Sequence, residues 1–389
     1  LLLKLLLSDE VFLQKLLQLL ELTQCIRLRH PPSRPKKSLS NQFSDSLEAS
    51  KSINPIQAGF LRGRGTQEQV AHHISILDFA KRMKKELHMA YIDLKKAFDT
   101  VPHEGIRHGL ERYNVEPDLI EQIMGCYKNM KSMYSSPWGE TDTVNIHMGV
   151  RQGDPLSPTL FIVFLNLFLD WAEKTSTKFN ADVPCFLLAY ADDLVFYAPD
   201  GKSLQEALGR FEKFLDFYGF AVGHDKCAYQ CTNTPEGSLN TSPVIQNAAL
   251  PVLAPSETYC YLGYDISMNL KWSVARDNTF VKCKRLLGAL DRAYYLDATT
   301  KAIAINAAVW PIALYRCLVP FSRTKLESLQ QKAQAVLRRA LRATNSFPSN
   351  LIAQETSLGG LNLQHLPLEM ESRRLSTIAS ILNKDGGDR

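Results

Sequence analysis

The stretch at residues 186–198, Phe-Leu-Leu-Ala-Tyr-Ala-Asp-Asp-Leu-Val-Phe-Tyr-Ala, constrains the fold more than any other. Two short apolar runs flank the adjacent carboxylates Asp192 and Asp193. Each run has the length of a buried strand, and the pair falls where a hairpin would turn. Two neighbouring carboxylates in such apolar surroundings repel each other and lose hydration. The opposite charge that offsets this cost is usually a divalent cation. The stretch therefore predicts a hairpin with a metal site at its tip; an Asp-Asp turn on the surface is the simpler alternative.

The overall composition sets only broad limits. The 389 residues are 45% hydrophobic and 22% charged, as in an ordinary folded protein, and the length predicts two or three domains or subdomains. The net charge of +5 indicates little about partners. The eight cysteines form no CxxC pair, and His224, Cys227 and Cys231 have the spacing of no common zinc site. We therefore expect neither a disulfide framework nor zinc.

The first residues and the apolar stretches bear on location. The chain opens Leu-Leu-Leu-Lys-Leu-Leu-Leu without an initiator Met, which reads as a fragment or a partial gene model. Lys4, Asp9 and Glu10 interrupt the leucines and no cleavage site follows, so we expect no signal peptide. The longest apolar stretch, residues 160–169, contains Asn166 and is too short to span a bilayer. We expect a soluble, intracellular protein of the nucleus or cytoplasm, with no membrane partner.

A further carboxylate motif begins at residue 89 and reads Met-Ala-Tyr-Ile-Asp-Leu-Lys-Lys-Ala-Phe-Asp. It has the pattern of a short apolar strand that ends in Asp93. An aspartate in this place is either a metal ligand or catalytic group, or the N-cap of a following helix. Together with Asp192 and Asp193, Asp93 supplies the three carboxylates on which a two-metal site typically draws.

Loops, helices and further strands follow from turn residues and hydrophobic spacing. The loop at residues 57–66 combines three glycines with Arg62 and Arg64, which can grip phosphate oxygens, although alone it is a weak signal. A basic segment at residues 27–37 reads as a linker, a phosphate-facing arm or a solvated loop. Helices are expected at residues 11–28, 72–86, 157–175 and 203–218. The last of these helices should begin with a Ser203–Glu206 capping box and end at Gly219. Strand pairs are expected at residues 220–231, which contain Lys226, and at residues 259–266.

The order of these motifs resembles the palm of template-directed polymerases. A strand ending in Asp, a Gln-Gly loop, an Asp-Asp hairpin, a lysine and an aromatic hairpin follow one another over roughly residues 55–265, as in a reverse transcriptase. Three blocks are similar to non-LTR retrotransposons, with group II intron enzymes next nearest: Tyr-Ala-Asp-Asp, Asp-Leu-Lys-Lys-Ala-Phe-Asp-Thr-Val-Pro-His and Gly-Val-Arg-Gln-Gly-Asp-Pro-Leu-Ser-Pro. The tail from Trp310 to Leu361 resembles elements that carry a restriction-like endonuclease.

The resemblance implies an α+β right-hand polymerase with fingers, a palm containing an antiparallel sheet, and a helical thumb. Residues 1–88 would form the N-terminal extension and fingers. Residues 89–268 would form the palm, with an inserted fingers part at about residues 112–148. Residues 269–389, where the chain turns helical and basic, would form the thumb and C-terminal connection. The family's usual early fingers block is not recognisable before Gln57.

The resemblance also implies roles for individual residues. Asp93 and Asp192 would hold two Mg²⁺ ions, with Mn²⁺ as a substitute and Asp193 assisting, and Lys226 would be the acid for the leaving pyrophosphate. Phe98 would exclude a ribose 2′-hydroxyl, unless it is an ordinary core residue. The remaining assignments are Tyr190, Gln152, Gly153, Arg62 and Arg64 to the nucleotide, and Tyr261, Leu262 and Gly263 to the primer end.

The implied partners are an RNA template, a DNA primer and dNTPs. Basic residues of the last part would follow the duplex backbone, although a solvated helix face is the simpler reading for any one of them. No endonuclease appears in the sequence, so that domain would lie elsewhere in a longer polyprotein. Two alternatives stay open: a nucleic-acid-binding protein that no longer catalyses, and an RNA-templated RNA polymerase, which Phe98 and Tyr-Ala-Asp-Asp disfavour.

Overall fold

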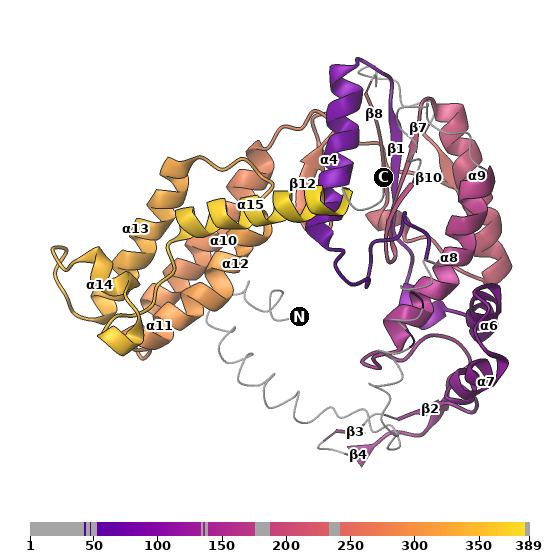
Figure 1. Ribbon diagram of the computed structural model, residues 1–389, viewed down its shortest axis with the longest axis horizontal. Coiled ribbons are helices and arrows are strands. Elements are labelled where there is room, and N and C mark those ends of the chain that lie inside the picture. Colours follow the sequence, from indigo (N-terminus) through magenta and orange to yellow (C-terminus); the bar gives the residue numbers. More distant parts are fainter. Residues whose placement is uncertain are drawn as a thin grey trace. The chain divides into compact units, whose positions relative to one another are not determined.

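The computed structural model (Figure 1) describes residues 43, 47, 53–133, 135, 136, 139–175, 187–232 and 242–385. The helix and basic segment expected between residues 11 and 37 lie outside these described residues, as does Phe186 of the hairpin. The chain divides into two compact units. Unit 1 comprises Leu1–Gly65 and Lys84–Val252, and unit 2 comprises Thr66–Met83 and Leu253–Arg389.

The centre of unit 1 is a four-stranded antiparallel sheet in the order β6-β7-β1-β8. Its strands are β1 (His88–Ile92), β6 (Leu187–Tyr190), β7 (Asp193–Ala198) and β8 (Ala228–Cys231). Most strand residues are buried, which explains why their sequences are continuous apolar runs. The strands β6 and β7 form the predicted hairpin, with Tyr190 opposite Asp193, so that prediction is confirmed.

Two long helices, α8 (Ser157–Thr175) and α9 (Gly201–Tyr218), pack on this sheet (Figure 1). The ring of Phe168 in α8 lies 4.5 Å from that of Phe211 in α9 and 6.3 Å from that of Phe196 in β7. All three rings are almost fully buried. The helix predicted at residues 157–175 is therefore confirmed, and its apolar character all round reflects burial against α6, α9 and the sheet.

The predicted start of α9 is wrong. The N-cap is Asp200, whose carboxylate accepts a hydrogen bond from the backbone N–H of Ser203 at 2.8 Å. Ser203 therefore lies inside the first turn and cannot cap the helix, which removes the capping box with Glu206. The end of the helix is confirmed, because Gly219 takes the left-handed conformation with φ 75°.

A second prediction is also wrong. Lys226 lies in the 3-10 helix η1 (His224–Lys226), so only β8 forms where a strand pair was expected.

The rest of unit 1 consists of short elements. The helices are α5 (Ala97–Thr100), α6 (His103–Arg112) and α7 (Pro117–Gly125). The two-residue strands are β2 (Lys131–Ser132), β3 (Ser135–Ser136), β4 (Gly139–Glu140), β5 (Val144–Asn145), β9 (Val244–Ile245) and β10 (Ala248–Ala249).

Unit 2 is mainly helical and contains one hairpin, β11 (Thr258–Tyr261) with β12 (Tyr264–Ser267), which confirms the predicted aromatic hairpin. The helix α4 (Thr66–Arg82) also belongs to it and begins six residues before the predicted helix at 72. The other elements are α10 (Ser273–Arg292), α11 (Ala298–Ala304), η2 (Ile305–Val309), α12 (Trp310–Tyr315), α13 (Arg323–Ala340), α14 (Ser349–Ala353), η3 (Thr356–Leu358) and α15 (Leu366–Asp385).

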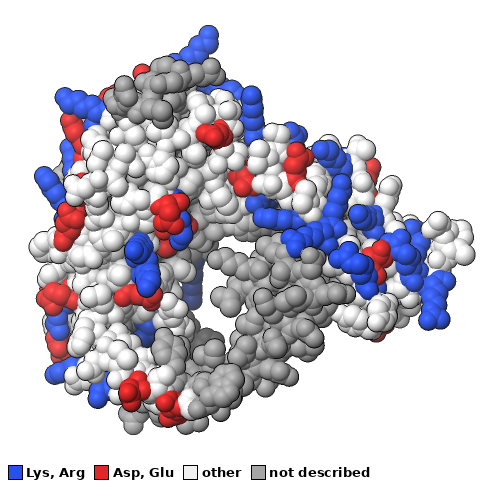
Figure 2. Space-filling model, turned by 180° about the vertical axis from the view of Figure 1, so that it is seen from behind, with Lys and Arg blue, Asp and Glu red and all other residues white. Residues whose placement is uncertain are grey.

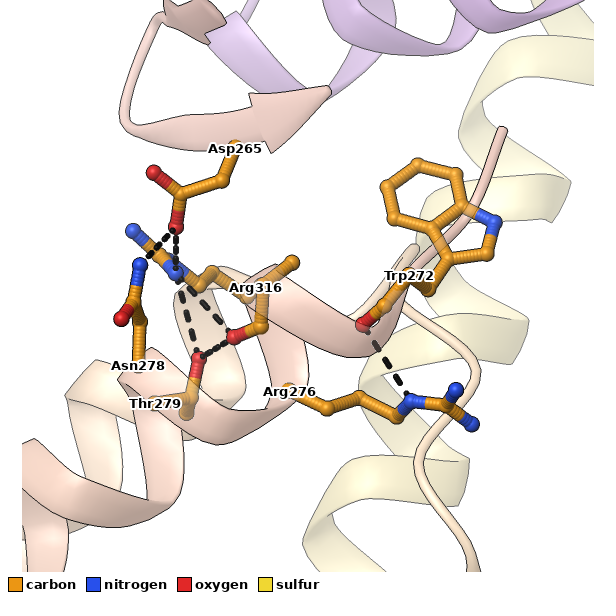
Figure 3. A network of polar contacts seen from close by, with 7 residues as sticks. Asp265, Trp272, Arg276, Asn278, Thr279 and Arg316 are labelled. Atoms are coloured by element: carbon orange, nitrogen blue, oxygen red, sulfur yellow. Dashed lines mark hydrogen bonds and ion pairs between the residues drawn. The ribbon is translucent and has the colours of Figure 1, made fainter. Parts of the chain in front are cut away.

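A buried ion pair fixes the β11–β12 hairpin to the helices of unit 2 (Figure 3). The guanidinium of Arg316, just after α12, donates to Asp265 Oδ2 at 2.8 Å and to Thr279 Oγ1 of α10 at 3.2 Å. Asn278 donates to the same carboxylate oxygen at 3.2 Å. Because Arg316 is 6% exposed, its charge is buried, and this pairing balances it. Separately, no helix among the described residues has the length and apolar composition needed to cross a membrane.

Candidate active site

Three carboxylates meet at one end of the sheet of unit 1. Asp93 directly follows β1, whose last residue, Ile92, pairs with Leu194 of β7. Asp193 is the first residue of β7, and Asp192 lies in the turn just before it. The register thus places Asp93 beside the hairpin tip. This explains why two segments 100 residues apart in the sequence both end in aspartate.

The electrostatics of these carboxylates show that they are crowded. Burial, followed by the charges of Asp192 and Asp93, raises the pKa of Asp193 to about 6. Burial also raises the pKa of Asp192, to which the charge of Asp93 contributes. Lys226 opposes both shifts. Added positive charge at this strand end would therefore favour the ionised carboxylates.

The segment after α9 wraps around Asp93. The ammonium of Lys226 lies 3.4 Å from Asp93 Oδ2, and the lysine side chain is 67% exposed. The backbone N–H of Gly223 donates to the carbonyl of Asp93 at 2.9 Å, and the N–H of Asp93 donates to Cys227 Sγ at 3.3 Å. A Cβ on Gly223 would lie 2.9 Å from Asp93 Oδ2, so a side chain there would push against the carboxylate.

Gly223 and Cys227 are two site residues that the sequence did not reveal. Cys227 reads as an ordinary packing residue, and a single glycine in a polar loop carries no signal of its own. Burial raises the pKa of the Cys227 thiol to about 11, so the group is neutral near pH 7 and serves as a hydrogen-bond partner of the backbone. Their shared function is to fix the backbone on both sides of the Asp93 carboxylate.

The donor set fits a hard divalent cation. Carboxylate and carbonyl oxygens are the ligands that Mg²⁺ prefers, and Asp93, Asp192 and Asp193 offer them at one place. Across residues 53–133, 139–175, 187–232 and 242–385, however, no three His, Cys, Asp or Glu side chains are already arranged around a common metal position. The three carboxylates therefore supply the ligand chemistry of a metal site.

Phe98 lies between two aromatic rings close after Asp93. It stacks on buried Phe161 of α8 with ring centroids 4.8 Å apart, and its other side meets the edge of Phe60 at 6.0 Å. Phe98 is only half-buried, and Phe60 is 53% exposed. The ring is thus anchored in the core and also reaches the surface, so both readings of Phe98 remain compatible with its position.

The other nucleotide-site candidates of unit 1 have different surroundings. Gln152 is held by Asp99, whose carboxylate accepts from its side-chain amide at 3.0 Å, and the neighbouring Gly153 has φ 86°. Arg62 is exposed. The guanidinium of Arg64 instead donates to two backbone carbonyls of its own loop, Pro55 at 2.5 Å and Gln57 at 3.1 Å. Arg64 therefore supports the loop.

The primer-end candidates lie in unit 2, at the turn between β11 and β12. Tyr261 is buried against His73 of α4, with ring centroids 5.2 Å apart, whereas Leu262 and Gly263 are at least partly exposed. The hydroxyl of Tyr315 donates to the Leu262 carbonyl at 2.8 Å. A Cβ on Gly263 would lie 3.0 Å from the Tyr315 ring. The turn backbone, more than the Tyr261 ring, is therefore what a ligand would meet.

Lys and Arg side chains gather over the helical part of unit 2 (Figure 2). Some are already neutralised: Arg339 forms two bonds to Asp291, at 2.7 and 2.8 Å, and Lys325 lies 3.8 Å from Asp277. In α10 and α13, four exposed members form no ion pair within the described part of the chain, namely Lys282, Lys284, Arg285 and Lys332. They offer positive charge to an anionic partner.

Comparison with known proteins assigns this fold to the right-hand polymerases. The family model described as reverse transcriptase (RNA-dependent DNA polymerase) matches residues 26–266, more than half of the chain. The chain belongs to the reverse transcriptase family. The match begins upstream of Gln57, where no early fingers block is recognisable in the sequence. Nucleotidyl transfer in this family generally requires a divalent metal ion.

The relatives are proteins of non-LTR retrotransposons, as the motifs predicted. The chain is 26% identical over 341 residues to the Pol polyprotein from the type-1 retrotransposable element R2 of Popillia japonica, covering 85% of this chain and 47% of that protein. It is 25% identical to the RNA-directed DNA polymerase from mobile element jockey of Drosophila funebris, covering 60% of this chain and 25% of that protein. The chain thus spans less than half the length of these relatives.

Among solved structures, apo telomerase from Candida tropicalis is similar with a TM-score of 0.46 and 15% identity, covering 90% of this chain and 58% of that one. At this TM-score the likeness adds nothing to the family assignment.

Proposed function

We propose that this chain is the polymerase part of a longer non-LTR retrotransposon protein and extends a DNA 3′-hydroxyl on an RNA template with dNTPs. The observation that carries the proposal is the meeting of Asp93 with Asp192 and Asp193 at one strand end beside Lys226, in a chain of the reverse transcriptase family. The greater length of the relatives fits an endonuclease elsewhere in the polyprotein. Residence in the nucleus or cytoplasm belongs to the same proposal.

In this function, Asp93 and Asp192 would hold two Mg²⁺ ions, or Mn²⁺ as a substitute, with Asp193 assisting and the carbonyl of Ile92 or Leu94 completing the shell. When bound, the ions lower the pKa of the primer 3′-hydroxyl and offset charge on the triphosphate. The raised pKa values of Asp192 and Asp193 support this assignment, because these carboxylates lack sufficient positive charge in the protein alone.

Lys226 would hold the proton that passes to the leaving pyrophosphate. Its ammonium lies 3.4 Å from Asp93 Oδ2, and 67% of its side chain is exposed. Because an exposed lysine pair is weak, the side chain can leave the carboxylate and meet a bound triphosphate. Gln152 and Gly153 would shape the nucleotide pocket with Tyr190 nearby, and Arg62 would contact the phosphates.

Phe98 would select deoxynucleotides. Its ring rests on buried Phe161, which prevents it from retreating, and its exposed part can clash with a ribose 2′-hydroxyl. In unit 2, the turn at Leu262 and Gly263 would hold the primer end, and the basic helices would contact the duplex backbone. Residues 1–88, 89–268 and 269–389 would then act as fingers, palm and thumb, with the fingers insertion at about residues 112–148.

Primer extension on an RNA template with dNTPs and Mg²⁺ tests the proposal. We expect extension by the parent and by Asp118→Asn, a change of an exposed carboxylate in the first turn of α7, and no extension by Asp192→Asn. If the parent binds the duplex in a salt-sensitive way yet does not extend it, the protein is a nucleic-acid-binding relative that no longer catalyses.

A further inference from the structure

The turn that carries Asp192 is held in a strained conformation. Ala191, between Tyr190 and Asp192, has φ 54° and is 3% exposed. The left-handed region is unfavourable for a residue with a Cβ. Neighbouring structure must therefore stabilise the turn, because a relaxed backbone at Ala191 would re-aim the Asp192 carboxylate.

The stabilising contact comes from Gln57, far away in the sequence. Its side-chain oxygen Oε1 accepts hydrogen bonds from the backbone N–H groups of Ala191 at 2.8 Å and of Gly59 at 2.7 Å. Gln57 is completely buried. Its Nε2 has no hydrogen-bond partner among the described residues, so the polar contacts of this side chain run through the acceptor oxygen.

The backbone around Gln57 follows β6, which is the edge strand of the sheet. The N–H of Ala58 donates to the Ala189 carbonyl at 2.9 Å, and the N–H of Ala189 donates to the Ile56 carbonyl at 3.4 Å. Gln57 and Ala189 form a parallel bridge. The segment thus forms a single parallel β-bridge beside β6, close to the hairpin tip.

Gly59 allows the segment to approach the turn closely. A Cβ at this position would lie 2.4 Å from the backbone nitrogen of Ala191, a distance that real side chains do not tolerate. At Gly65, by contrast, nothing lies within 4 Å of an added Cβ. The same substitution at these two glycines therefore disturbs the hairpin tip in one case and open space in the other.

We infer that Gln57 is a positioning residue for polymerisation: its acceptor oxygen holds Ala191 in the conformation that aims Asp192 at the reacting groups. This inference rests on the proposed function. It gives the loop at residues 57–66 a task at the hairpin tip that differs from phosphate contact. Gln57 touches neither substrate nor metal and acts through the turn.

The test is pre-steady-state incorporation of one complementary dNTP with excess primer–RNA-template duplex. The burst amplitude measures the fraction of enzyme molecules that are competent, and the burst rate constant measures how fast these molecules incorporate the dNTP. Gln57→Met keeps an unbranched side chain of similar size and removes the acceptor. We expect this variant and Gly59→Ala to lose about 10- to 100-fold in burst rate constant, with unchanged duplex affinity, and Gly65→Ala to match the parent.

Two outcomes would overturn the inference. In one, Gln57→Met or Gly59→Ala has the burst rate constant of the parent. In the other, the burst amplitude falls while the burst rate constant stays that of the parent, which means that the contact serves folding alone. A parent that incorporates no dNTP would instead show that the proposed function itself is wrong, and the inference would fall with it.

Discussion

At the scale of single residues, the candidate site consists of carboxylates whose negative charges repel one another. Asp192 and Asp193 are adjacent in the chain, and Asp93 is brought to them by the strand register. Burial and mutual repulsion make their ionisation costly, and Lys226 offsets only part of that cost. This arrangement has consequences for stability as well as for activity.

Asp193→Asn should stabilise the metal-free protein at neutral pH. The folded-state pKa of about 6 lies above the ordinary value of 3.8, so the folded protein binds this proton more tightly than the unfolded chain. Stability therefore falls as the pH rises from about 4 to 6 and stays lower above it. We expect the variant to gain roughly 1–3 kcal/mol at pH 7.5 and little at pH 4, measured by urea unfolding in EDTA. An equal gain at both pH values would contradict the assignment.

Gly223→Ala should impair catalysis without unfolding the protein. The added Cβ meets Asp93 Oδ2 at 2.9 Å and displaces the carboxylate. We expect a loss of about 10- to 100-fold in the extension rate. Gly209→Ala, in α9 with open space around the new Cβ, is the matched control and should keep the parent rate. Equal rates for both variants would rule out a crowded Asp93.

At the scale of elements, the strands could be predicted from the sequence better than the contacts between segments. The β6–β7 hairpin and the placement of Asp93 follow from uninterrupted apolar runs, whose burial leaves little choice of structure. The start of α9 is wrong by a few residues because Asp200 and Ser203 are both good caps, and only the backbone shows which one bonds. The contact of Gln57 with Ala191 depends on a close approach between distant segments, which no local pattern encodes.

The buried ion pair of unit 2 should matter more for stability than an exposed pair with better geometry. Arg316→Met leaves the Asp265 carboxylate, 15% exposed, without its cation and should cost about 3–5 kcal/mol. Arg339→Met breaks two bonds to Asp291, but that guanidinium is 58% exposed, and we expect a cost below about 1 kcal/mol. Thermal unfolding compares the two variants. A smaller loss for Arg316→Met than for Arg339→Met would contradict the role given to the network in Figure 3.

At the scale of the whole molecule, a net charge of only +5 conceals an uneven distribution. The carboxylates of the candidate active site lie in unit 1, whereas the unpaired lysines of α10 and α13 lie in unit 2. In the proposed function, the carboxylates of unit 1 would hold the metal ions, and the lysines of unit 2 would contact the duplex backbone. The sequence predicted that residues 269–389 would be helical and basic, but not that α4 would belong with the helices of this part.

Duplex binding should depend on salt through the basic surface of unit 2. Removing the unpaired cations Lys284 and Lys332 should weaken primer–template affinity. It should also reduce the slope of log affinity against log salt by about 1–2. The matched control removes Lys202 and Lys213, two exposed lysines of α9 in unit 1, with the same change in net charge. Fluorescence anisotropy at several salt concentrations measures both, and an equal effect of the two double variants would count against a dedicated surface.

The most direct test of the central claim is RNA-templated extension by Asp93→Asn. This residue follows β1, whereas Asp192 lies in the β6–β7 turn, so the two share a site only if the strand register brings them together. We predict that Asp93→Asn abolishes extension as completely as Asp192→Asn, while both variants still bind the primer–template duplex like the parent. Extension by Asp93→Asn at the rate of the parent would contradict the account, because the carboxylates would then not act as one site.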